Sequence, residues 1–168
     1  MQTKKNNQTK VGVIGLGYVG LPLAMLFLKN NVKTYGFDID KTKIDMLLNG
    51  HSYIGHIKSD EIKSIDSEMF YPTIDFSKSA DCDALIICVP TPLTENREPD
   101  LSYVEETLIS LRPYLRKGQM ISLESTTYPG TTRDILVKFI EEEGFIVGED
   151  IFVVYSPERE DPGNKNFD

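Results

Sequence analysis

The chain has 168 residues, of which 40% are hydrophobic and 26% charged, and this composition is typical of one globular domain. Its net charge of −8 argues against a protein that binds nucleic acid or an anionic membrane surface. The two cysteines, Cys82 and Cys88, form neither a disulfide framework nor a metal-ligand pattern, so we expect a protein of the reducing cytoplasm.

The segments between residues 11 and 38 predict a dinucleotide site. An apolar strand at Val11–Ile14 is followed by the glycine-rich segment Gly15–Gly20 and by an apolar helix at Leu21–Leu28. A second strand at Lys33–Asp38 ends in an acid. A strand, a G-x-G-x-x-G turn, a helix and an acidic strand end, in this order, are the pattern of dinucleotide binding.

Each glycine of this pattern has a separate mechanical role. Gly15 permits the tight turn, Gly17 leaves room for a pyrophosphate, and Gly20 lets the helix pack closely on the strand. The pyrophosphate is expected at the helix N-terminus, where unpaired N–H groups and the helix dipole favour negative charge. The carboxylate of Asp38 would accept both ribose hydroxyls and repel a 2′-phosphate, which predicts NAD rather than NADP.

The same segment has an alternative interpretation as a membrane span or signal peptide. The range Val11–Leu28 contains no charged residue, and Lys4, Lys5 and Lys10 precede it. Four glycines and Pro22 argue against both alternatives, and no small-residue cleavage site follows. We therefore expect no membrane association.

The next segments are predicted to be short. A helix is expected at Lys41–Leu48, and His51 and His56 follow in a loop, where no acidic or thiol partner supports a metal site. A short helix at residues 60–67 and a short strand at residues 73–76 come next. The buried face of the first of these helices is predicted to consist of Ile44, Leu47 and Leu48.

A continuous apolar run at Asp83–Val89 predicts a strand that is covered on both faces of a parallel sheet. Cys88 lies near its end, but apolar neighbours would raise the pKa of this thiol and leave it inert. The loop Pro90–Leu93 leaves the strand at its carboxyl end, on the edge where open α/β sheets bind ligands.

The following helix is expected to begin with Ser102 as its cap and Glu105 three residues later, which is a capping-box spacing. A strand at Met120–Leu123 then delivers the hydroxyl-rich loop 124–132 to the ligand-binding edge. The buried stripe of the helix is predicted to consist of Val104, Leu108, Leu111 and Leu115.

The last predicted elements are a helix from about residue 132 to 143 and a strand at Ile151–Tyr155. Thr131 and Thr132 are interpreted as helix caps, whereas Thr126 is better placed to face a ligand. The charged loop 156–164 would be costly to order without a ligand or partner.

The element pattern predicts an α/β fold, a Rossmann-type doubly wound parallel sheet flanked by helices, with strand order 3-2-1-4-5-6. The domain is expected to span residues 10–168. Residues 1–9 are polar and without periodicity, so a disordered leader is expected there.

Four ordered motifs resemble the UDP-glucose/GDP-mannose dehydrogenase family, and the resemblance covers essentially all of residues 10–168. Within the family, the segment Tyr155–Asn164 is most similar to the UDP-N-acetylglucosamine 6-dehydrogenase branch, with the UDP-N-acetylmannosamine branch as the close competitor. The four motifs are Gly15–Pro22, Cys88–Pro92, Glu124–Thr132 and Ser156–Arg159.

The resemblance implies oxidation of a sugar C6 alcohol to a carboxylate with two NAD⁺ in turn, through a thioester on a cysteine. It implies that Thr126 lies beside the nicotinamide and the catalytic water, and that Glu158 acts as a general base. Residues implied to contact the UDP-sugar are Glu158, Arg159, Glu160, Asp161 and Pro162. Residues implied or predicted to contact NAD are Gly15, Gly17, Tyr18, Val19, Gly20, Asp38, Lys43, Val89, Pro90, Thr91 and Thr126.

The 168 residues do not contain all the functional parts of the family. Its nucleophilic cysteine, an accompanying lysine and asparagine, and its UDP-binding domain lie beyond the first Rossmann domain, and neither Cys82 nor Cys88 matches the nucleophile. We therefore expect an N-terminal part of a longer enzyme, homo-oligomeric at full length, that binds NAD but does not turn over alone. A stand-alone NAD-binding module is the alternative. A methyltransferase is disfavoured by the tight glycine turn and the later motifs.

Overall fold

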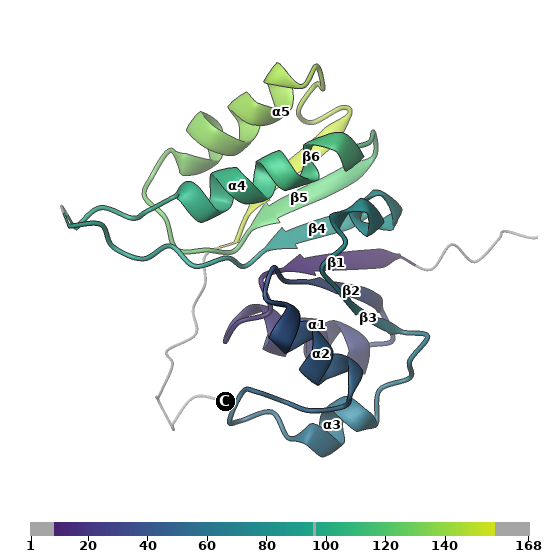
Figure 1. The fold of residues 1–168 in the computed structure, drawn as a ribbon. Helices are drawn as coiled ribbons and strands as arrows, with labels where there is room; N and C mark the ends of the chain where they lie inside the picture. The colour runs from purple at the N-terminus through teal and green to yellow at the C-terminus, as the bar shows by residue number, and fades with distance from the viewer. Residues whose placement is uncertain (1–8, 96, 157–168) are drawn as a thin grey trace, which may run out of the picture.

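A computed structural model describes residues 9–95 and 97–156, and these residues form one parallel sheet with helices on both faces (Figure 1). The strand order is β3-β2-β1-β4-β5-β6, and every neighbouring pair is parallel. This confirms the predicted fold class and strand order. The strands are β1 (Lys10–Ile14), β2 (Lys33–Phe37), β3 (Phe70–Thr73), β4 (Ala84–Ile87), β5 (Gln119–Leu123) and β6 (Ile151–Tyr155).

The helices connect successive strands. In Figure 1, α4 and α5 lie over the half of the sheet that contains β5 and β6, whereas α1, α2 and α3 gather beside the other half. The α-helices are α1 (Gly20–Lys29), α2 (Lys41–Leu48), α3 (Ser59–Lys63), α4 (Ser102–Leu111) and α5 (Lys138–Glu142). The shorter or irregular helical segments are η1 (Phe76–Asp81), η2 (Arg112–Tyr114) and η3 (Thr132–Val137), of which η3 is a π-helix.

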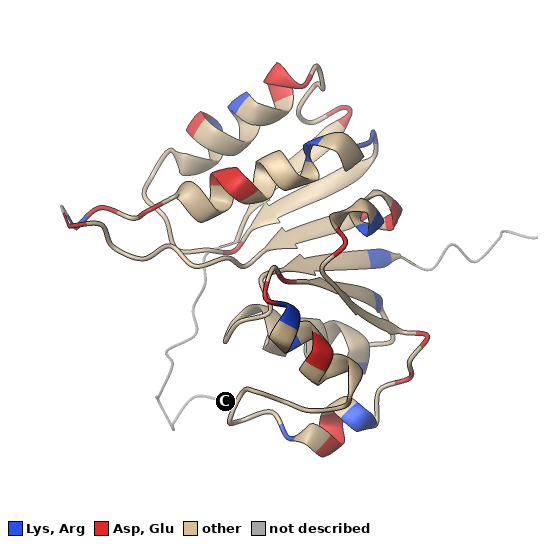
Figure 2. Ribbon diagram, viewed as in Figure 1, with Lys and Arg blue, Asp and Glu red and all other residues tan. Residues whose placement is uncertain are grey.

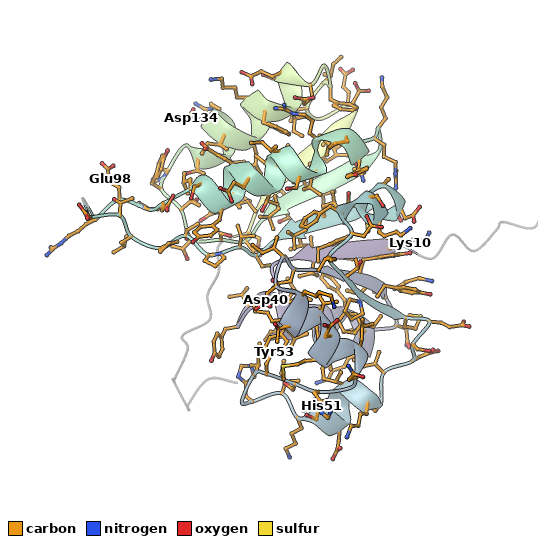
Figure 3. The ribbon with its side chains drawn as sticks, viewed as in Figure 1. Lys10, Asp40, His51, Tyr53, Glu98 and Asp134 are labelled. Carbon is orange, nitrogen blue, oxygen red and sulfur yellow. The ribbon has the colours of Figure 1, made fainter. Side chains whose placement is uncertain are left out.

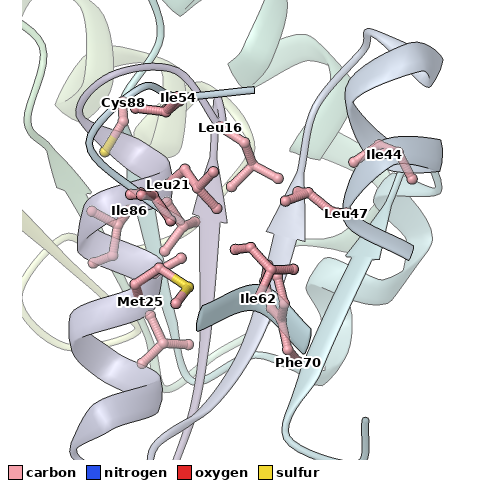
Figure 4. Packing of buried hydrophobic residues seen from close by; sticks show 14 of the residues in the cluster. Leu16, Leu21, Met25, Ile44, Leu47, Ile54, Ile62, Phe70, Ile86 and Cys88 are labelled. Atoms are coloured by element: carbon pink, nitrogen blue, oxygen red, sulfur yellow. The ribbon is translucent and has the colours of Figure 1, made fainter. Parts of the chain in front are cut away.

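Two hydrophobic cores lie on opposite faces of the sheet, because successive strand residues point to opposite sides. On β4, Ala84 and Ile86 belong to the first core, which packs against α1, α2 and α3 (Figure 4). Leu85 and Ile87 belong to the second core, which packs against α4, η3 and α5. This arrangement explains why β4 is apolar at every position, as the sequence predicted.

Charged residues lie mainly on the helices, on the loops and at the strand ends, and the middle of the sheet carries none (Figure 2). The uncharged run at the start of the chain is divided among β1, the glycine turn and α1. Among the described residues, no helix has the length and apolar character that crossing a membrane requires.

The third strand lies three residues earlier than predicted. It occupies Phe70–Thr73 because it pairs with β2, where Phe37 is opposite Thr73. Asp75 then ends the extended segment, since its side chain accepts a hydrogen bond from the Ser77 N–H and caps η1. Phe76 does not extend the strand but packs against the ring of Phe37 at a centroid distance of 5.5 Å.

Two helices also differ from their predicted lengths or faces. The helix predicted at residues 60–67 is confined to α3, Ser59–Lys63, where the Glu61 side chain accepts the Lys58 N–H. On α2, Ile44 and Leu47 are buried as predicted, but Leu48 is 64% exposed. Leu48 therefore belongs to the solvent side of its helix.

The predicted helix caps were wrong in chemical detail. Ser102 is the first residue of α4 rather than its cap, and its N–H donates to a carboxylate oxygen of Asp100 over 3.0 Å. Thr131 precedes η3, but its hydroxyl donates to the Tyr128 carbonyl over 2.9 Å and does not cap the helix. The predicted helix at 132–143 is divided into η3 and α5.

Gln119, the first residue of β5, bonds three backbone groups at the amino edge of the sheet, opposite the ligand-binding edge. Its side-chain NH₂ donates to the carbonyls of Ser79 and Cys82, and its oxygen accepts the Arg116 N–H over 2.8 Å. The residue is fully buried. A buried amide whose nitrogen and oxygen are both hydrogen-bonded stabilises the fold. Its removal leaves buried backbone groups without partners, which destabilises the fold.

We expect Gln119→Leu to lower the free energy of unfolding by about 3 kcal/mol, because it leaves buried backbone groups without partners. Urea denaturation followed by circular dichroism measures this change. The exposed substitution Glu141→Leu on α5 is the control and should change stability by less than about 0.5 kcal/mol. An equal, small effect of both substitutions would contradict the structural role of Gln119.

Candidate functional site

A cavity of about 600 Å³ opens at the carboxyl edge of the sheet, next to the glycine turn. It lies where β1 adjoins β4, and this is the point at which the strand order reverses direction. Open α/β sheets bind ligands at such a switch point. The lining includes these residues that were predicted from the sequence to contact a ligand: Gly15, Gly17, Tyr18, Val19, Asp38, Lys43, Val89, Pro90, Thr91 and Thr126.

The three glycines of the turn meet three different requirements. Gly15 has φ of 88°, a left-handed conformation that other residues rarely adopt. A Cβ on Gly20 would collide with the carbonyl oxygen of Gly15, so only glycine fits where α1 begins. A Cβ on Gly17 would meet no protein atom within 4 Å. Space beside the Gly17 backbone is therefore open to a ligand, as the sequence predicted.

The first turn of α1 is available to an anion. Val19 occupies the N-cap position and makes no side-chain hydrogen bond to the helix. The first turn of α1, all of it within the described residues, contains no acidic residue. Helix N-terminal N–H groups without side-chain partners favour a phosphate group through both hydrogen bonding and the helix dipole.

Asp38 is held in one orientation at the end of β2. One carboxylate oxygen accepts the Leu16 N–H over 2.9 Å and the Lys43 ammonium over 3.1 Å. The other accepts the Asp40 N–H over 2.9 Å. The side chain is only 6% exposed but lines the cavity. These bonds fix the carboxylate beside the turn and bring Lys43 next to it.

The opposite wall of the cavity joins the loops that follow β4 and β5. The Ser125 hydroxyl donates to the Val89 carbonyl, and the Thr91 hydroxyl donates to the Thr126 carbonyl, both over 2.6 Å. These two cross-links hold the loops together. Thr126 lines the same cavity.

Several lining residues were not predicted from the sequence. Ser125 was unassigned, and Phe76 was assigned to a strand. The polar face of α4 was also missed, because the apolar stripe of that helix was interpreted and its neighbouring face was not. The spacing of three to four residues along this second face was the available signal. Its lining residues are Tyr103, Glu106, Thr107 and Ser110.

Both cysteines are buried among the described residues. Burial, together with the carboxylates of Asp81 and Asp83, raises the pKa of the Cys82 thiol to about 12, so this thiol stays protonated. Cys88 lines the cavity but is only 8% exposed and packs within the first core.

Some predicted residues lie elsewhere. Glu158, Arg159, Glu160, Asp161 and Pro162 fall outside the described residues, as do residues 1–8 of the predicted leader. His51 and His56 are exposed, and in the described ranges no three His, Cys, Asp or Glu side chains gather as a metal site would require.

Residues 9–168 match the family model of the UDP-glucose/GDP-mannose dehydrogenase family, NAD binding domain. The chain belongs to this family. Its cofactor is therefore NAD, and the observed site fits that cofactor. The cavity has a volume in the range of small-molecule sites, an open backbone at Gly17 for the pyrophosphate, and the Asp38 carboxylate for a ribose.

The names of the similar proteins refer to two different UDP-sugars. The chain is 39% identical over 157 residues to UDP-N-acetyl-D-glucosamine 6-dehydrogenase from Pseudomonas aeruginosa, covering 93% of the chain and 36% of that protein. It is 35% identical to UDP-N-acetyl-D-mannosamine dehydrogenase from Campylobacter jejuni, covering 94% and 40%. The native structure of the UDP-N-acetyl-mannosamine dehydrogenase Cap5O from Staphylococcus aureus superposes with a TM-score of 0.83 at 37% identity, covering 90% and 37%. The chain thus spans well under half the length of these relatives.

Proposed function

We propose that the chain is the NAD-binding part of a cytoplasmic nucleotide-sugar 6-dehydrogenase that oxidises UDP-N-acetylglucosamine to its uronic acid for surface polysaccharide synthesis. The cavity that joins the glycine turn, Asp38 and Thr126 is the observation that carries the proposal. The 39% identity to the Pseudomonas aeruginosa enzyme favours this sugar. The overall reaction removes four electrons from the C6 alcohol as two hydrides, one to each of two NAD⁺, and water supplies the second carboxylate oxygen.

The residues of this chain would bind and orient the cofactor. The backbone at Gly17 and the first turn of α1 would hold the pyrophosphate, and Asp38 would accept the adenosine ribose hydroxyls. Thr126 would lie beside the nicotinamide, opposite the glycine turn. Glu158 would act as the general base during hydrolysis, with residues 159–162 against the UDP-sugar. These roles follow from the family motifs on which the residues lie.

A related candidate is UDP-N-acetylmannosamine dehydrogenase, which the Campylobacter jejuni relative and the Cap5O structure favour. UDP-glucose is a further candidate substrate. A stand-alone NAD-binding module is the alternative of a different class, supported by the burial of both described cysteines. We propose that the active protein is a homo-oligomer in which catalysis needs residues that this chain does not supply.

Calorimetric titration of the chain with NAD⁺ and NADP⁺ tests the cofactor assignment. We expect saturable NAD⁺ binding that is at least about tenfold tighter than NADP⁺ binding, because a 2′-phosphate would approach the buried Asp38 carboxylate. The pairing of Lys43 with this carboxylate moderates the discrimination without reversing it. Equal binding of the two cofactors would contradict the role of Asp38.

Absorbance of NADH measures the proposed activity. We expect no steady NADH production from the 168-residue chain with UDP-N-acetylglucosamine, UDP-N-acetylmannosamine or UDP-glucose. The product of the whole reading frame should oxidise UDP-N-acetylglucosamine fastest. Turnover by the 168-residue chain would overturn the proposal that catalysis needs further residues, and faster oxidation of another sugar would reassign the substrate.

A further inference from the structure

The loop between α2 and α3 holds the glycine turn from outside the cavity. The Tyr53 hydroxyl donates a hydrogen bond of 2.7 Å to the Leu16 carbonyl, 37 residues away along the chain. Figure 3 shows Tyr53 in this loop next to Asp40. The half-buried ring packs against the first core. Tyr53 therefore connects a remote segment to the backbone of the turn.

The segment that carries Tyr53 is itself well fixed. The Ser52 N–H donates to the Ser59 hydroxyl over 3.1 Å, and the Ser52 hydroxyl is hydrogen-bonded to the backbone of Ile54. Ile54 and Ile57 are buried in the first core beside Leu16. Because these contacts order the loop before any ligand arrives, the phenol can hold the turn at little additional entropic cost.

Both backbone polar groups of Leu16 are engaged by different parts of the fold. Its N–H donates to Asp38, and its carbonyl accepts from Tyr53. Its side chain is fully buried and packs at the position where Gly36 leaves room for it. Leu16 is thus the fixed point of the turn, immediately before Gly17, which faces the cavity.

The Leu16 carbonyl and the Gly17 N–H belong to one planar peptide group, and among the described residues no peptide is cis. In a trans peptide the N–H points away from the carbonyl, so a carbonyl directed at Tyr53 turns the Gly17 N–H to the opposite side. We propose that Tyr53 is a positioning residue for NAD, which fixes the peptide that presents the Gly17 N–H to the pyrophosphate. The proposal rests on NAD binding by this domain.

The phenol keeps its proton in this environment. Burial raises the pKa of Tyr53, and the nearby carboxylates of Asp38 and Asp40 raise it further. Tyr53 is therefore a hydrogen-bond donor at any pH at which the protein would be assayed. The tether, by which we mean the hydrogen bond from Tyr53 to the Leu16 carbonyl, depends on one hydroxyl group that phenylalanine lacks. The ring and its packing are shared by both residue types.

The test compares Tyr53→Phe with the parent chain in calorimetric titrations with ADP-ribose and with adenosine. Only ADP-ribose carries the pyrophosphate, so its affinity should fall about three- to tenfold, whereas adenosine affinity should stay within about twofold. A general loss of structure would weaken both ligands. Tyr71→Phe, on β3 and outside the lining of the cavity, is the matched control and should change neither affinity.

Amide hydrogen exchange of the unliganded chain provides a second measurement. Tyr53→Phe should speed exchange at the Leu16 amide and leave exchange in β4 unchanged. Unchanged ADP-ribose affinity, an equal loss for both ligands, or wild-type exchange at Leu16 would each overturn the proposal. Absence of NAD⁺ binding by the parent chain would instead overturn the proposed function, and the exchange rates would still decide whether the tether exists.

Discussion

Gly17→Ala should abolish measurable NAD⁺ binding, with a loss of at least about 100-fold, and leave the stability of the fold unchanged. The added methyl group meets no protein atom within 4 Å, so the protein itself accommodates it. In the complex, however, the methyl group would stand where the pyrophosphate approaches the backbone. Calorimetry with NAD⁺ and thermal unfolding of the unliganded chain together measure the two effects.

Two other glycine-to-alanine substitutions serve as comparison variants for Gly17→Ala. Gly20→Ala should reduce both binding and stability, because its Cβ would collide with the Gly15 carbonyl oxygen and displace the turn. Gly55→Ala, in an exposed loop with open space around it, should reduce neither. If Gly17→Ala bound NAD⁺ like the parent chain, the pyrophosphate would have to lie elsewhere and the site would need to be reassigned.

The parts of the site that depend on local sequence were predictable. Backbone requirements that arise within a few residues, such as the left-handed turn at Gly15, are encoded locally, and the sequence located them correctly. The strand order was also predictable, because alternating strands and helices allow few connections of the correct hand. Asp38 followed from its distance to the glycines along the chain.

Features that depend on remote partners were missed or misplaced. The position of β3 is decided by pairing with β2, since the segment near Thr73 and Ile74 contains no apolar pattern that marks where the strand ends. Asp100 supplies the hydrogen bond at the start of α4, and because Asp and Ser are about equally favoured as caps, residue type alone did not distinguish Asp100 from Ser102. Tyr53 contacts Leu16 across 37 residues, and a single aromatic residue in a loop gives no indication of its partner.

Asp38→Ala should weaken NAD⁺ binding by at least about tenfold and remove most of the discrimination against NADP⁺. The carboxylate that would accept the ribose hydroxyls is lost. Lys43, released from its 3.1 Å pair with Asp38, becomes available to a 2′-phosphate. NADP⁺ affinity should therefore fall less than NAD⁺ affinity. Calorimetry with both cofactors on the same preparations measures the two affinities.

The same substitution should lower the free energy of unfolding by about 1–3 kcal/mol, because the Leu16 and Asp40 N–H groups lose their acceptor. Asp45→Ala is the matched control, since Asp45 pairs with Lys41 on the solvent side of α2 and should affect neither binding nor stability by a comparable amount. A parallel loss of NAD⁺ and NADP⁺ affinity would show that Asp38 only supports the turn. A selective loss of NAD⁺ affinity would establish that its carboxylate also recognises the ribose, so that one buried side chain both shapes the glycine turn and selects the cofactor.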